Sequence, residues 1–235
     1  MKKPYVKKHS VVSGFMVWIV DGNYVRTHLD EEFTNFGQHY VFPIIPKNEF
    51  WIDHEYGKRE EIKYYVDNLL EENRLLREKK SYNSALFKAD KLERAERRTS
   101  QVFRHRGKRV IQKIRTRLLK KYSQHINVWV VDGELVRDTF FLDFTEGGHH
   151  YRYRFIPQKD VWIDDDISPR ERKFVLLHEL AERNLMAERL HKKNHPTPYK
   201  VYDWAHRKAS KLESYSRHHP QKLDSLLKAE LEKSV

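Results

Sequence analysis

The stretch Val-Trp-Ile-Val-Asp-Gly at residues 17–22 returns almost unchanged as Val-Trp-Val-Val-Asp-Gly at residues 128–133. The two stretches are 111 residues apart, and the same offset gives 21 identities over the 55 ungapped positions 17–71. A match of this length indicates an internal duplication, which decides the whole fold. We therefore predict two copies of one domain, at 11–93 and 126–220, joined by a connector at 94–125 and followed by a C-terminal helical tail at 221–235.

Each copy has strand-forming residues first and helix-forming residues after them. Residues 17–25 are β-branched and aromatic, and the Asp21-Gly22 pair that interrupts them is typical of a hairpin turn. Further strands are expected at 40–45 and 50–52, separated by Pro46. In the second copy, Ser168 to Glu171 has the spacing of a helix start, and a second helix is expected from about Pro198 to Ser216. This order predicts an α+β fold in which a small antiparallel sheet is followed by a helical hairpin.

The positive charge is concentrated in the connector. The chain has 46 Lys and Arg against 34 Asp and Glu, a formal net charge of +12, and residues 94–125 alone hold 12 basic groups and one acidic group. An apolar stripe from Val110 to Tyr122 predicts a basic amphipathic helix there, which suits nucleic acid or an acidic protein partner. The candidate contacts are Arg104, Arg106, Arg109, Lys113, Arg115, Arg117, Lys120 and Lys121.

Composition excludes several classes of protein. No apolar run approaches the roughly 18 residues of a membrane helix, and the basic N-terminus lacks an apolar signal core, so we expect a cytoplasmic protein. The absence of cysteine excludes disulfides and thiolate metal sites. The two glycine-rich motifs that bind phosphates, GxGxxG and GxxxxGK, are both absent, so no nucleotide cofactor is expected.

A candidate metal site lies in the second copy. His178 and Glu182 are four residues apart and share one helical face, and His206 lies on the next helix. If the two helices pack antiparallel, these three side chains meet, and Glu213 on the second helix can join them. Two imidazoles and a carboxylate leave a coordination position open, as catalytic zinc or another divalent metal requires. His150, next to a repeated glycine, is a reserve ligand.

The stretch Leu176-Leu177-His178-Glu179-Leu180-Ala181-Glu182-Arg183 resembles the active-site helix of zincin-like metallopeptidases. It is also similar to uncharacterised small domains of phage and prophage type that carry an HExxE or HExxH helix after a short sheet. The resemblance implies His178 as a metal ligand and Glu179 as the catalytic general base. It also implies a host cytoplasm or a virion as the location. Glu182 stands where the zincin pattern has its second histidine.

The first copy serves as an internal comparison. At the offset of 111, the residues aligned with His178, Glu179 and Glu182 are Asp67, Asn68 and Glu71. After a nine-residue insertion in the second copy, Leu86 aligns with His206. Either the second copy keeps a site that the first has lost, or these positions drift in both. Three functions therefore stay open. They are a metal-dependent hydrolase, a nucleic-acid-binding protein that uses the connector, and a phage or virion structural protein.

Overall fold

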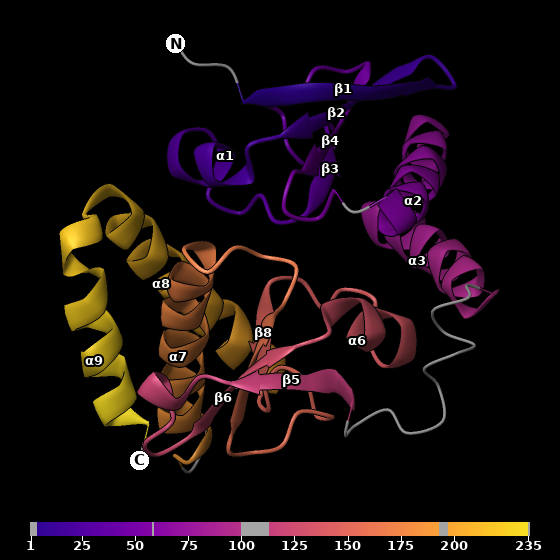
Figure 1. Cartoon of the computed structure of the whole chain (residues 1–235). Coiled ribbons are helices and arrows are strands. Elements are labelled where there is room, and N and C mark those ends of the chain that lie inside the picture. The colour runs from indigo at the N-terminus through magenta and orange to yellow at the C-terminus, as the bar shows by residue number, and fades with distance from the viewer. Residues whose placement is uncertain (1–3, 58, 100–112, 193–196, 235) are drawn as a thin grey trace. The chain divides into compact units, whose positions relative to one another are not determined.

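Figure 1 shows a computed structural model of the chain, which describes residues 4–57, 59–99, 113–192 and 197–234. Two compact units are present: unit 1 comprises Met1–Val110 and Glu134–Asp143, and unit 2 comprises Ile111–Gly133 and Phe144–Val235. Each unit contains a four-stranded sheet followed by helices, which confirms the duplicated α+β organisation. Within the described ranges, no helix is both long and apolar enough to cross a membrane.

Unit 1 has the sheet order β1-β2-β4-β3. Its elements, in chain order, are β1 (Tyr5–Val12), β2 (Phe15–Val20), α1 (Gly22–His28), β3 (Phe36–Gln38), β4 (Glu49–Asp53), α2 (Arg59–Arg77) and α3 (Tyr82–Thr99). The helix α6 (Gly133–Thr139), which comes from the second repeat, belongs to this unit for most of its length. There Arg137 pairs with the buried Glu61 at 2.8 Å.

Unit 2 repeats the arrangement with the sheet order β5-β6-β8-β7. Its strands are β5 (Arg115–Leu118), β6 (Asn127–Val131), β7 (Gly147–His149) and β8 (Asp160–Asp164), with the 3-10 turn η1 (Lys120–Tyr122). The helices that follow are α7 (Glu171–Leu190), α8 (Pro198–His218) and α9 (Leu223–Lys233), with the 3-10 turn η2 (Pro220–Lys222). Helix α7 contacts β7, β8, α8 and α9, so its residues are positioned from several directions (Figure 1).

The sheets are mixed rather than antiparallel, which corrects the prediction. Strand β2 runs parallel to β4, and β6 runs parallel to β8, while the other pairs are antiparallel. The chain passes through a short helix and a strand before it returns, so a parallel pair can form. Trp18 lies opposite Trp51 and Trp129 opposite Trp162, in the same register in both units. The segment 40–45, predicted as a strand, is a turn that places Ile45 in the core with Phe33.

The Asp-Gly pairs start helices and do not form hairpin turns. Asp21 caps α1, because its side chain accepts a hydrogen bond from the backbone N–H of Tyr24 at 2.9 Å. Glycine is needed next to it, since a Cβ on Gly22 would lie 1.8 Å from an oxygen of Asp53. The Asp53 carboxylate instead accepts the N–H of Gly22 at 3.3 Å and binds Arg26 at 2.9 Å. The repeated Asp-Gly pair therefore marks a close approach of backbone and carboxylate.

The connector is not one helix. Residues 115–118 form the edge strand β5, which pairs with β6 as β1 pairs with β2. Residues 115–118 can form a strand at this edge because basic side chains suit an edge strand whose outer face meets water. Each repeat therefore begins earlier than predicted, and the basic N-terminal residues Lys7 and Lys8 lie in β1. Residues 100–112 of the connector, which include the start of the predicted helix, lie outside the described residues.

Candidate metal centre

Helices α7 and α8 bring the three predicted ligands together. His178 Nε2 lies 3.1 Å from His206 Nδ1 and 3.5 Å from Glu182 Oε2, and His206 Nδ1 lies 2.9 Å from the same carboxylate oxygen. Ligand atoms bonded to one tetrahedral zinc at about 2.0–2.2 Å are roughly 3.3–3.6 Å apart. The three atoms therefore already have nearly the spacing that a single ion requires.

Burial differs around the cluster and leaves one side open. The Glu182 side chain is 4% exposed and that of His178 is 12% exposed, whereas His206 is 32% exposed. The face of His206 is therefore where water or a substrate can approach. The ring of Tyr202 stacks beside His206, with ring centroids 5.4 Å apart, and Arg152 lies over the Tyr202 ring.

A second layer of side chains orients His178. Its Nδ1 lies 2.9 Å from Glu213 Oε2, so Nδ1 carries the proton and Nε2 is left to face Glu182 and His206. Glu213 also accepts a hydrogen bond from Arg217 Nε at 2.9 Å, and Arg217 pairs with Glu171. A carboxylate that binds the far nitrogen of a ligating histidine is the usual outer partner in metal sites. The cluster therefore has an orienting layer as well as three ligands.

The electrostatics of the cluster favour charged carboxylates and a charged imidazole. Although burial opposes it, Arg217 and His178 hold the pKa of Glu213 down at about 2. Three histidines likewise hold the pKa of Glu182 well below its usual range against the effect of burial. The pKa of His178 is raised, since its hydrogen bonds to Glu182 and Glu213 outweigh its burial. Without a metal, the cluster therefore holds a proton in the place where a cation fits.

Glu179 lies beside the three ligands and has a different environment. Burial raises the pKa of its carboxyl, and the neighbouring charge of Glu182 raises it further. Its side chain is 12% exposed, and its Oε2 lies 4.0 Å from His149 Nε2. A carboxylate whose pKa moves toward neutrality suits proton transfer at physiological pH.

His149 was not predicted as a metal ligand, whereas the neighbouring His150 was predicted as a reserve ligand. Successive residues of a strand point to opposite faces, and in β7 the side chain of His149 reaches Glu182 Oε1 at 2.9 Å. His150 instead bonds the carbonyl of Ile156 through Nδ1 at 2.8 Å, as a structural residue does. The available signal was that His149 is replaced by Gln38 in the first repeat, whereas His150 is repeated as His39.

The first repeat contains the same framework of contacts, shifted by one residue from the predicted alignment. The Glu61–Arg97 contact of the first repeat corresponds to Glu171–Arg217 in the second. Asn68–Glu93 corresponds to His178–Glu213. Gln38–Glu72 corresponds to His149–Glu182. The offset along the first helix is thus 110, because one residue fewer separates Asp164 from Glu171 than separates Asp53 from Glu61.

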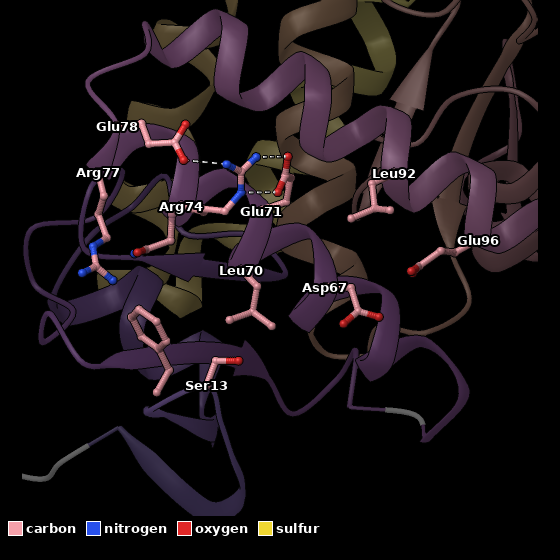
Figure 2. Close-up of a pocket in the computed structure, with 11 residues that line it drawn as sticks. Ser13, Asp67, Leu70, Glu71, Arg74, Arg77, Glu78, Leu92 and Glu96 are labelled. Carbon is pink, nitrogen blue, oxygen red and sulfur yellow. Dashed lines mark hydrogen bonds and ion pairs between the residues drawn. The ribbon is translucent and has the colours of Figure 1, made fainter.

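Figure 2 shows where the residues of the earlier alignment lie. Asp67 and Glu71 line a cavity of about 760 Å³ in unit 1, on another face of α2. There Glu71 pairs with Arg74, which also binds Glu78 at 2.6 Å. These charges neutralise one another at the surface and correspond to no part of the cluster in unit 2.

With the corrected register, the two repeats differ in a consistent way. The carboxylates and arginine of the framework are retained, whereas every further metal-capable side chain is replaced. The replacements, second repeat before first, are His149 by Gln38, His178 by Asn68, Glu179 by Leu69 and His206 by Leu86. The first repeat therefore shows that the framework can form without histidine.

The predicted nucleic-acid contacts are only partly described. Arg104, Arg106 and Arg109 lie outside the described residues. Arg115 pairs with Asp160 and lies over the Trp129 ring, so its charge is already engaged. The exposed members are Lys113, Arg117, Lys120 and Lys121.

Comparison of the chain with protein-family models, with curated proteins and with solved structures gave no match. The assignment of a function therefore depends on the chemistry of the site.

Proposed function

We propose that unit 2 is a divalent-metal-dependent hydrolase, with the metal held by His178, Glu182 and His206. The observation that carries the proposal is that three ligand atoms from two helices lie within 3.5 Å of one another. The Glu213–Arg217 pair behind His178 supports it, because a histidine held by an outer carboxylate is pre-oriented for a metal.

The donor set suits zinc first among the common metals. Two imidazoles and one carboxylate are the ligands of several catalytic zinc sites, and they also fit manganese, iron and cobalt. Such an ion would lower the pKa of a bound water toward neutrality. Glu179 would accept the proton of that water, and the more exposed side at His206 would admit the substrate.

The test is elemental analysis of the full chain after purification in metal-free buffer and incubation, in separate samples, with zinc, manganese, iron or cobalt. We expect bound zinc in the wild type and its loss in His178→Asn and His206→Leu, which introduce the residues of the first repeat. His218→Gln, at an exposed position, is the control and should keep the metal. Absence of bound zinc, manganese, iron and cobalt from the folded wild type would refute the proposal.

The catalytic part of the proposal has its own test. Glu179→Gln should retain the ion held by the other three residues while losing hydrolysis of a panel of ester, peptide and phosphate substrates. Activity equal to the wild type in a Glu179→Gln protein with bound metal would show that Glu179 is not the proton acceptor.

A second proposal concerns the basic segment. Residues 94–125 carry a net charge of +11, and Lys113, Arg117, Lys120 and Lys121 are exposed, which supports binding of nucleic acid or an acidic protein. Such binding, whether by an enzyme or by a non-enzymatic phage structural protein, should weaken steeply with salt. Filter binding of duplex DNA at several salt concentrations tests this. The lack of cysteine agrees with a cytoplasmic location, which we include in the proposal.

A further inference from the structure

The cluster in unit 2 contains a second group of ligand atoms beside the first. We call His178, His206 and Glu182 Oε2 the outer set, and His149, Glu179 and Glu182 Oε1 the inner set. Each set has its ligand atoms within 4.8 Å of one another. The His149 side chain is fully buried, and Nε2 points at Glu182 Oε1 from 2.9 Å.

The two sets meet at the Glu182 carboxylate, which turns one oxygen to each. Oε1 faces His149, and Oε2 faces His206 at 2.9 Å. A carboxylate with nitrogen ligands gathered at both oxygens has the geometry of a bridge between two metal ions, which in two-metal hydrolytic sites lie about 3.5–4 Å apart. From this arrangement we propose that the inner set is a second metal position and that the centre is dinuclear, with Glu182 as the bridging ligand.

The charges around the cluster agree with two cations. Arg217 neutralises Glu213 and Glu171 at the far side of the cluster. Among the described residues, the ion-pair partners of Glu179 and Glu182 are histidines. Glu182 is buried and Glu179 is partly buried, and divalent cations would stabilise the charged form of both carboxylates.

The first repeat argues against a purely structural role for His149. There Gln38 occupies its place and reaches Glu72 across the same gap, while Asn73 donates to Gln38 Oε1 at 2.6 Å. An amide therefore fills the strand position without loss of the local contacts. Histidine at 149 occurs together with Glu179 and both outer histidines, and all four are replaced together in the repeat that lacks a metal-ligand set.

The inference rests on the proposed function and extends it. With the outer ion alone, Glu179 accepts the proton of the water. With both ions bound, Glu179 becomes a ligand of the inner ion, and the two ions share the work of binding and activating the water. Loss of Glu179 therefore removes hydrolysis in both states but removes an ion only in the dinuclear state.

The test measures metal stoichiometry in the full chain. Metal-free protein is equilibrated with excess Zn²⁺, freed of unbound ion and analysed, and a parallel sample is loaded with Mn²⁺ for electron paramagnetic resonance. The variants are His149→Gln and Glu179→Leu, which carry the first-repeat residues, and Glu182→Gln, which removes the bridge charge. His150→Gln is the control, and circular dichroism verifies that each protein is folded.

We expect two zinc ions per chain in the wild type and in His150→Gln, one in His149→Gln, and loss of both in Glu182→Gln. The manganese spectrum should show spin coupling in the wild type and isolated ions in His149→Gln. One ion in both the wild type and His149→Gln would overturn the second position and leave the proposed function standing. No ion in the wild type would overturn both. Two ions in both proteins would overturn the assignment to His149. If His149→Gln is unfolded, Glu179→Leu is read by the same criteria.

Discussion

Glu213, the carboxylate that lies behind the metal ligand His178, offers the most direct test of how the site is built. In Glu213→Gln the amide oxygen can still accept the His178 Nδ1 hydrogen bond, now 2.9 Å long, but the negative charge is lost. An ion on His178 Nε2 would lie about 7 Å from that charge, given a metal–nitrogen bond of about 2.1 Å and the width of the imidazole ring. At an effective dielectric constant of about 20, a divalent ion and this charge attract by roughly 5 kcal/mol, which is an upper limit.

Measured effects of outer-layer substitutions are smaller, about 10- to 100-fold in metal affinity. We therefore expect the zinc dissociation constant of Glu213→Gln to rise by that factor, which equals about 1.4–2.7 kcal/mol. The assay is competition against a chromophoric chelator at pH 7.5. Its matched control is Glu93→Gln, which removes the equivalent buried carboxylate next to Arg97 in unit 1.

Both substitutions should lower the free energy of unfolding, since each removes a partner of a buried arginine. Only Glu213→Gln should weaken zinc binding. An affinity within about twofold of the wild type, or an equal loss in Glu93→Gln, would show that Glu213 does not support the metal ligand.

Three further results are expected. Burial, together with the charge of Asp143, raises the pKa of Asp90 to about 7 in the folded protein. The folded state therefore prefers the protonated carboxyl, and the free energy of unfolding should fall as the pH rises from about 4, the ordinary pKa of aspartate, to about 7. Asp90→Asn should be more stable than the wild type by about 1–2 kcal/mol at pH 8 and equal to it below about pH 4, measured by urea unfolding. Gly22→Ala should cost about 1–3 kcal/mol, because its Cβ would meet the Asp53 carboxylate; an unchanged midpoint in thermal unfolding would contradict this. Zinc at 100 times its dissociation constant should stabilise unit 2 by about 2.7 kcal/mol in calorimetry, reversibly with chelator, and should leave His178→Asn unaffected.

The meeting of His178, Glu182 and His206 could be predicted because it needs only two rules. Side chains four residues apart share a helical face, and consecutive helices joined by a short link pack side by side. Both rules depend on the local sequence. The duplication gave the order of elements for the same reason, since each repeat carries its own strand and helix signals.

The features that could not be predicted depend on three-dimensional context. Aspartate followed by glycine suits both a turn and a helix start, because in each the side chain bonds a nearby backbone N–H. The burial of the Asp53 carboxylate against Gly22 decided between them. The parallel pairing of β2 with β4 likewise depends on the path of the chain between them.

The helix register shows a related limit. A shift of one residue rotates a helical position by about 100°, so Glu71 and Glu72 point to different faces although both are glutamates. The ungapped alignment matched Glu71 to Glu182, and the contact of Glu72 with Gln38 shows that Glu72 is the equivalent residue. His149 was not predicted as a ligand because its partner Glu182 lies 33 residues away in the sequence, so no local pattern joins the two.

The amide network of unit 1 gives the two repeats different responses to their surroundings. Asn73 donates to Gln38, Gln38 donates to Glu72 and Asn68 donates to Glu93, and amides keep the same charge at every physiological pH. In place of Gln38 and Asn68, unit 2 has His149 and His178, and an imidazole, unlike an amide, can gain or lose a proton. A modest acidification would therefore leave the charge of these amides unchanged while protons compete with any cation at the histidines of unit 2. One ancestral framework has thus given rise to one version that contains neutral amides and one version whose occupancy follows acidity and metal supply.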